Sequence, residues 1–190
     1  MEAQEFWESF SNQIQTNQIE LEEKWDSHSN EKGKETPFTK KIKEVIANAI
    51  KYRKPSDEFI VQPEYYNIDL TEWEQKKGKP KEKLFVENGL EGYGFEKYAW
   101  NFDIAVEHEN DKNLWMDEVI KLAYIFCYLR VVIGYFPYIE EADKKIEMQQ
   151  KYLDAISETI KTLKCRENMK HGGFMVILGD VVVKETENFE

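Results

Sequence analysis

Apolar side chains recur at helical spacing in several stretches of the chain. In residues 1–25 they alternate with polar residues and predict an amphipathic helix, which packs on the domain or on a partner protein; they are Trp7, Phe10, Ile14, Leu21 and Trp25. Thr36-Pro37 predicts the start of a second helix, because a hydroxyl cap precedes a proline at the first helical position. That helix extends to about residue 52, and a third is expected over 114–126.

Strands are expected over 59–73, 98–110, 129–136 and 174–183, and the third of these is an almost continuous apolar run typical of a strand covered on both faces. A long amphipathic helix should precede the last strand; its apolar stripe is Ile139, Ile146, Leu153, Ile156, Ile160 and Leu163. This order of elements predicts an α/β fold with a central mixed sheet flanked by helices. Residues 1–35 are expected to form an N-terminal helix and a polar linker, and residues 36–190 a single domain.

Composition narrows the class of protein. With 41% hydrophobic residues in 190, the chain can bury a proper core, so disorder is excluded. A net charge of −11 disfavours a simple DNA-binding module but suits an enzyme that gathers carboxylates around cations. Two cysteines, no apolar signal core and no run that could span a bilayer favour a cytoplasmic protein without membrane contact.

Residues 101–110 form an unusually acidic strand. Alternation places Phe102, Ile104 and Val106 on one face, and on the other the series Asp103, Ala105, Glu107 and Glu109. A solvent-exposed face would tolerate these carboxylates. The helix and the apolar strand that follow favour a central position instead, where half-buried carboxylates need a cation such as Mg²⁺ or Mn²⁺.

A further carboxylate precedes this strand. Asp69 shares a face with Asn67 and Thr71, so on a neighbouring strand it would meet Glu107 and Glu109. Such an oxygen cage could hold one or two Mg²⁺ ions and activate water against a phosphodiester. His108 projects to the opposite, apolar face and is interpreted as a core histidine rather than a catalytic base.

These residues and their order resemble the PD-(D/E)XK, or restriction-endonuclease-like, phosphodiesterase superfamily over about residues 37–136. The resemblance implies a restriction-endonuclease-like core, with Asp69 as the metal-binding Asp, Glu107 as the (D/E) residue and Mg²⁺-dependent cleavage of nucleic acid. Glu109 occupies the position of the family's lysine. Lys121 on the next helix is the candidate replacement, although a helical wheel places it away from the apolar stripe and nearer to a solvent pair with Glu118.

Other functions remain open. A lysine-rich loop is a solvated connection or a contact for nucleic-acid phosphates; its lysines are Lys76, Lys77, Lys79, Lys81 and Lys83. The chain could be a non-catalytic binding protein on a nuclease-like scaffold, engaging a protein or a second copy through its acidic surface or N-terminal helix. In a third interpretation, an unrelated α+β fold exposes the acidic strand.

Overall fold

The computed structural model describes eight segments of the chain, namely residues 2–26, 36–51, 59–65, 68–75, 100–109, 115–136, 139–163 and 172–180. Its helices are α1 (Ala3–Asp26), α2 (Pro37–Lys51), α4 (Trp115–Ala123) and α5 (Ala142–Thr162). Its strands are β1 (Phe59–Tyr65), β2 (Ile68–Gln75), β3 (Trp100–His108), β4 (Leu129–Phe136) and β5 (Gly173–Asp180). None of the described helices has the length and apolar character needed to cross a lipid bilayer.

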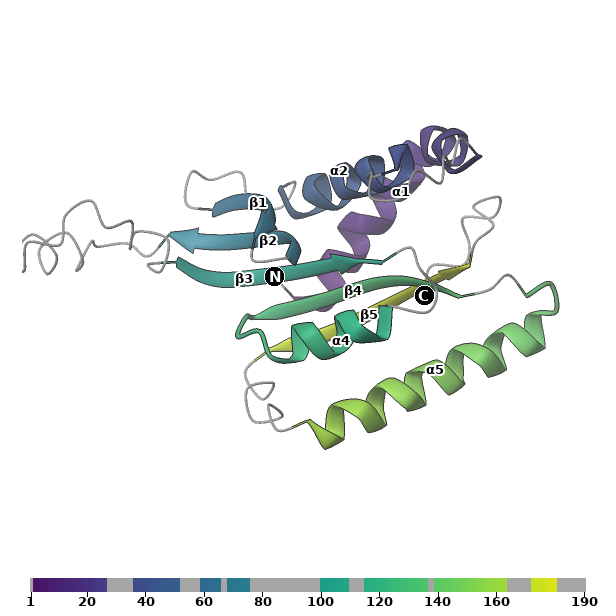
Figure 1. Ribbon diagram of the computed structural model, residues 1–190. Coiled ribbons are helices and arrows are strands. Elements are labelled where there is room, and N and C mark those ends of the chain that lie inside the picture. The colour runs from purple at the N-terminus through teal and green to yellow at the C-terminus, as the bar shows by residue number, and fades with distance from the viewer. Residues whose placement is uncertain are drawn as a thin grey trace, which may run out of the picture.

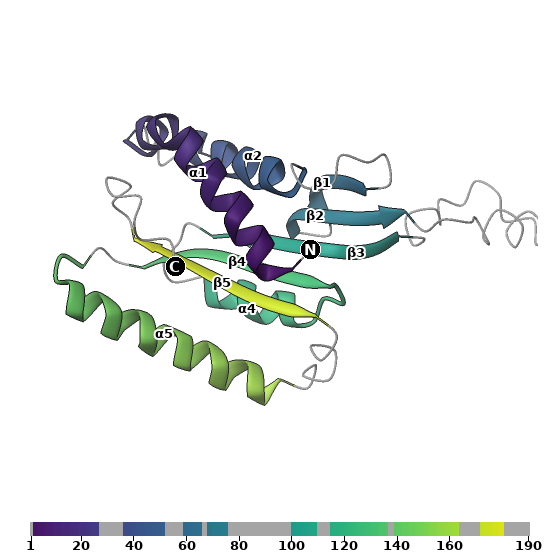
Figure 2. The ribbon, with the colours of Figure 1, turned by 180° about the vertical axis from the view of Figure 1, so that it is seen from behind.

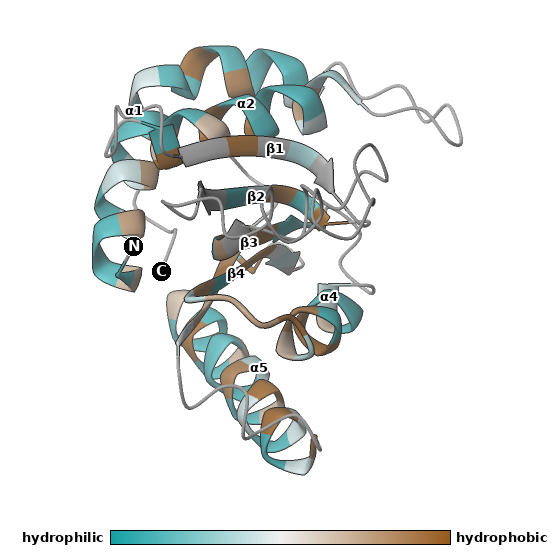
Figure 3. Cartoon of the chain, turned by 90° about the vertical axis from the view of Figure 1, so that its left-hand side faces the viewer, coloured by the Kyte–Doolittle hydropathy of each residue, from teal (hydrophilic) through white to brown (hydrophobic). Residues whose placement is uncertain are grey.

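The five strands form one mixed sheet in the order β1-β2-β3-β4-β5, which confirms the predicted α/β class. The pairs β1–β2 and β2–β3 are antiparallel, whereas β3–β4 and β4–β5 are parallel. Helix α4 connects β3 to β4, and α5 connects β4 to β5. Both lie on one face of the sheet, and α1 and α2 cover the other face (Figures 1, 2 and 3).

The face below α1 and α2 holds the larger hydrophobic core. Phe10 and Ile14 of α1 pack there with Ile104 and Val106 of β3, which alternation predicted to be core residues. Helix α2 starts as expected, since the Thr36 Oγ1 atom accepts a hydrogen bond of 3.1 Å from the backbone nitrogen of Thr39. The apolar face of α1 is therefore buried within the same chain.

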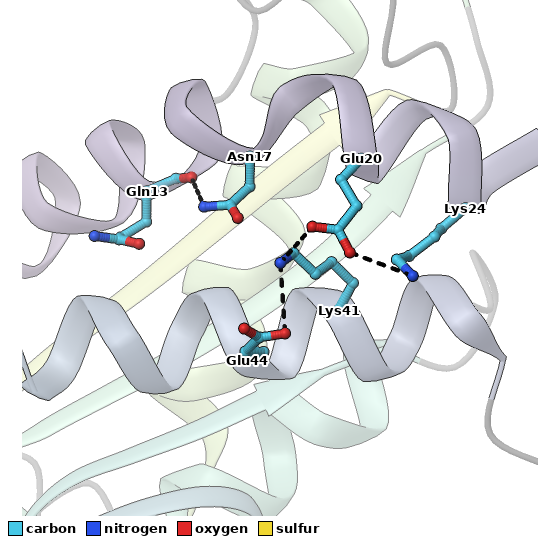
Figure 4. A network of polar contacts seen from close by, with 6 residues as sticks. All are labelled: Gln13, Asn17, Glu20, Lys24, Lys41 and Glu44. Atoms are coloured by element: carbon cyan, nitrogen blue, oxygen red, sulfur yellow. Dashed lines mark hydrogen bonds and ion pairs between the residues drawn. The ribbon is translucent and has the colours of Figure 1, made fainter.

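A polar seam joins α1 to α2 along their outer side (Figure 4). The Lys41 Nζ atom lies 2.6 Å from Glu20 Oε2 and 3.4 Å from Glu44 Oε2. Lys24 contacts the same Glu20 carboxylate at 3.3 Å. Because Lys41 is 8% exposed, its charge depends on these carboxylates and ties the two helices in one register.

In the opposite core, below α4 and α5, the predicted apolar stripe of the long helix is only partly buried. Ile156 is the buried residue of α5, whereas Ile146 and Leu153 of the predicted apolar stripe are 64% and 46% exposed. The neighbouring α4 has nine residues and α5 has 21. At about 1.5 Å per residue the shorter helix covers less than half of the longer one.

Two boundaries and the side of one residue also differ from those predicted. The stretch 59–73 contains two antiparallel strands, and Pro63 is tolerated because β1 is the edge of the sheet. Phe102 packs with the α4 side rather than with Ile104, because the β2–β3 register shifts between Glu72 and Trp73. The third helix was expected to reach residue 126, but α4 ends at Ala123 and Phe126 is 68% exposed.

The packing of α1 can be tested with two identical substitutions on that helix. Ile14→Ala should lower the free energy of unfolding by about 2–5 kcal/mol, because it leaves a cavity in the core. Ile19→Ala should change it by less than about 0.5 kcal/mol, because Ile19 is 74% exposed whereas Ile14 is 5% exposed. Urea unfolding followed by circular dichroism measures both values. Equal losses would contradict the burial of α1 against the sheet.

Candidate active site

Two of the predicted site residues lie at the same end of the sheet. β2 begins at Ile68 and β3 ends at His108, and Leu70 pairs with Val106 in their antiparallel ladder. One further step in that register brings Asp69 opposite Glu107. The expectation that the strands carrying these two carboxylates are neighbours is therefore confirmed.

Glu107 is a buried carboxylate that is paired with a lysine from α4. The Lys121 Nζ atom lies 2.7 Å from Glu107 Oε1 and also contacts the Glu118 carboxylate, one turn earlier on the helix. The side chain of Glu107 is 4% exposed and that of Lys121 is 33% exposed. The predicted Lys121–Glu118 pair is present, but Lys121 is not merely a solvent residue, since it spans the gap between helix and sheet.

Asp69 holds the neighbouring position with two different partners. Its Oδ1 atom lies 2.8 Å from the Nζ atom of Lys43 on α2. Its Oδ2 atom accepts a hydrogen bond of 2.8 Å from the backbone nitrogen of His108. The carboxylate is thus fixed at both oxygens, to the end of β3 and to the helical layer on the α2 side.

The electrostatic balance around Glu107 favours its neutral form. Burial raises the pKa of Glu107; the Lys121 ammonium opposes this shift, while the charges of Asp69 and Glu118 add to it, and the result is a pKa of about 8. The pKa of Lys121 is raised because the attraction of Glu107 and Glu118 outweighs its partial burial. One ammonium group therefore does not fully compensate the carboxylates around it.

His108 points into the α1–α2 side of the molecule, as its place in the strand predicts. Its Nε2 atom lies 3.0 Å from the hydroxyl oxygen of Tyr135 on β4, and the ring packs beside Phe38. Burial lowers the pKa of His108 to about 4, so the imidazole is neutral near pH 7. The side chain of His108 is therefore part of the core, and its backbone nitrogen positions Asp69.

The remaining carboxylates do not complete a metal cage. Glu109 follows the end of β3, where its backbone nitrogen donates a hydrogen bond of 2.9 Å to the Ile133 carbonyl oxygen. Within the described segments, no group of three or more histidine, cysteine, aspartate or glutamate side chains is arranged to hold a metal ion. Asp69 and Glu107 lie on neighbouring strands and interact electrostatically, but their carboxylates pair with lysines of helices on opposite faces of the sheet. Because Mg²⁺ commonly uses one or two carboxylates together with water and substrate phosphates, these two carboxylates are the candidates for a partial ligand set.

Sequence patterns did not identify the role of two cations in this part of the fold. Lys43 lies on the polar side of α2, and nothing in the sequence links it to Asp69, which is 26 residues away. Arg130 was included in an apolar strand, yet it is completely buried and pairs in the ladder with Ala105, two residues before Glu107. The sequence signal for a buried cation was the single charged residue in an otherwise apolar run. The lysine-rich loop at 76–83 lies outside the described residues.

The raised pKa of Glu107 predicts a measurable cost to stability. Between pH 4.5 and about 8 the folded protein keeps the Glu107 proton while the unfolded chain has released it, so this contribution to stability falls as the pH rises. Glu107→Gln should therefore match the wild type below pH 4.5 and exceed its free energy of unfolding by roughly 2–4 kcal/mol near pH 8. Urea unfolding across this range, without divalent metal, measures the difference.

Glu147→Gln provides the control for that experiment. Glu147 is exposed on α5 and pairs with Lys151 at 2.6 Å, so its substitution should leave the pH profile between 4.5 and 8 unchanged. A wild-type profile parallel to that of Glu107→Gln would show that Glu107 ionises normally and that the site is more open than its burial indicates.

The site therefore consists of two carboxylates on neighbouring strands, each paired with a lysine from a different helix. Comparison of the chain with protein-family models, with curated proteins and with solved structures finds no match. The arrangement of Asp69, Glu107, Lys43 and Lys121 is the basis on which a function can be inferred.

Proposed function

We propose that the protein is a Mg²⁺-dependent nuclease-like hydrolase of phosphodiester bonds, with Asp69 and Glu107 as metal ligands and Lys121 as the catalytic lysine. The observation that carries this proposal is the contact of 2.7 Å between Lys121 Nζ and Glu107 Oε1, beside Asp69 on the adjacent strand. Two carboxylates and an ammonium group at one end of a sheet suit the chemistry of phosphoryl transfer.

The order of elements supports the resemblance to the restriction-endonuclease-like core. Helix α2 is followed by β1, β2 with Asp69, β3 with Glu107, α4 and the buried strand β4. Glu109 stands where that family has its lysine, and the ammonium group comes instead from α4 in this chain. Lys121 would then stabilise the negative charge that develops on the phosphate, the role for which a preorganised cation is most effective.

The charges at the site favour a divalent cation. Asp69, Glu107 and Glu118 carry three carboxylates, whereas Lys43 and Lys121 supply two ammonium groups. The pKa of Glu107 is raised first by burial and further by the charges of Asp69 and Glu118, and Lys121 offsets this only in part. Mg²⁺ or Mn²⁺ bound to Asp69 and Glu107 would supply the missing positive charge and would lower the pKa of a bound water towards neutrality.

Substrate contacts must overcome the net charge of −11 locally. Lys43 and Lys121 place two ammonium groups at the end of the sheet where β3 finishes. We assign further phosphate contacts to Lys76, Lys77, Lys79, Lys81 and Lys83. Their contribution should weaken steeply with salt, as for any contact made through phosphates.

One observation favours a second candidate function. Both carboxylates already have a lysine partner within 2.8 Å, so the cluster is also suited to a purely structural ion-pair network. In that case the protein is a non-catalytic binding protein that keeps a nuclease-like scaffold. Its partner would use a surface other than the apolar face of α1, which is buried in the core.

A cleavage assay tests the proposed nuclease. The wild type should nick plasmid and degrade single-stranded DNA in the presence of Mn²⁺, with RNA as a parallel substrate. Glu107→Ala and Lys121→Met should each reduce the rate by about 10²–10³-fold, the loss typical of removing one group that stabilises the transition state. Lys161→Met is the matched control, because Lys161 pairs with Glu158 three residues away on exposed α5 as Lys121 pairs with Glu118.

Calorimetric titration separates the two functions. A nuclease should bind Mn²⁺ and lose this binding in Glu107→Ala, whereas a structural ion-pair network should bind no divalent metal. Failure of the wild type both to bind the ion and to cut either nucleic acid would refute the nuclease and leave the non-catalytic binding protein.

A further inference from the structure

Arg130 is a fully buried cation on β4, in the core below α4. Its Nε atom donates hydrogen bonds to the carbonyl oxygens of Leu122 at 3.1 Å and Ile125 at 2.9 Å. Its Nη1 and Nη2 atoms are buried and have no hydrogen-bond partner among the described residues. The guanidinium charge thus faces the carbonyl end of α4, where the helix dipole is negative.

The turn that Arg130 holds is the turn that carries Lys121. The backbone nitrogen of Tyr124 donates to the Lys121 carbonyl oxygen at 3.2 Å, and that of Ile125 donates to the Leu122 carbonyl oxygen at 3.0 Å. These three-residue hydrogen bonds tighten the end of the helix. Arg130 adds a link from the sheet to the same carbonyl of Leu122, so the sheet fixes the backbone next to Lys121.

The other end of α4 is fixed by the same strand. A methyl group at Gly134 would lie 2.8 Å from Trp115 Cγ, so the first residue of α4 packs directly on the backbone of β4. Helix α4 has nine residues, which is too short to be stable without tertiary contacts. Its position over Glu107 is therefore determined by Gly134 at one end and Arg130 at the other.

We propose that Arg130 is a positioning residue, which anchors the last turn of α4 so that the Lys121 ammonium group stays in contact with Glu107. An apolar side chain would fill the same space without the cost of burying a charge. The charge suits a task that an apolar residue cannot perform, namely holding two backbone carbonyl groups at once. The catalytic consequence rests on the proposed function, whereas the placement of Lys121 does not.

The ammonium group of Lys121 can be observed directly by NMR. Lysine side-chain signals in ¹H–¹⁵N spectra at low temperature and mild acidity report ammonium groups that are held in hydrogen bonds and exchange slowly with water. The spectra are recorded in a Glu118→Gln background, which leaves Glu107 as the carboxyl partner of Lys121. The Glu118→Gln protein should show such a signal for Lys121, identified by its absence once Lys121→Met is added. Arg130→Met should abolish the signal, and Arg130→Lys, which keeps a cation that can donate to the carbonyls, should restore it.

Ile14→Ala controls for loss of stability alone, because it weakens the distant core below α1 and should leave the Lys121 signal intact. If Arg130→Met does not fold, Arg130→Leu replaces it, and the same loss is expected since an apolar side chain cannot donate to the carbonyl groups. A folded Arg130→Met or Arg130→Leu variant that keeps the Lys121 signal would overturn the proposal. So would a Glu118→Gln protein without the signal.

Kinetics distinguish failure of this inference from failure of the proposed nuclease. Where the wild type cleaves nucleic acid, Arg130→Met should lower kcat by at least 10-fold with little change in KM, and Arg130→Lys should recover most of the loss. An unchanged kcat would overturn the catalytic consequence. Where the wild type cleaves nothing, the nuclease is refuted, and the NMR comparison still decides whether Arg130 places Lys121.

Discussion

The contact between Glu107 and Lys121 is the interaction on which the rest of this site depends. A glutamate side chain that is 4% exposed needs a polar partner in the protein core, whether or not it is ionised. Lys121 is that partner only if α4 lies across the end of β3, and α4 lies there because β4 holds both of its ends. The environment of the Glu107 side chain therefore depends on the position of the short helix α4.

Alternate residues of the strands face the two different cores of the protein. On β3, Ile104 and Val106 face the core below α1 and α2, whereas Ala105 faces the core with α4. Asp69 breaks this separation, because it reaches Lys43 on α2 and yet influences Glu107. It can do so because it lies at the start of β2, where the sheet ends and both layers are within reach of one carboxylate.

Much of the fold followed from local patterns, and the parts that did not follow depend on tertiary contacts. Helical spacing and the Thr36-Pro37 cap located α1 and α2, and a continuous apolar run located β4. The β-bulge changes the face on which Phe102 lies, and α5 is only partly covered by other elements. Both features result from contacts between segments that are distant in the sequence, and the local spacing of apolar residues does not reveal such contacts. A helical wheel misjudged Lys121 for another reason. It gives the direction of a side chain from the helix axis, but a lysine is long and flexible enough to reach back to the sheet.

The charge count of the site explains why its two candidate functions are so closely matched. Three carboxylates and two ammonium groups leave one negative charge, and the protein can remove it by keeping a proton on Glu107 or by binding a divalent cation. The first solution gives a stable ion-pair network without chemistry, and the second gives a metal centre with a lysine beside it. Because proton and metal compete for the same carboxylate, the raised pKa of Glu107 weakens metal binding at low pH and favours it as the pH rises. The same buried carboxylate that makes the free protein less stable is thus the group through which a metal would restore that stability.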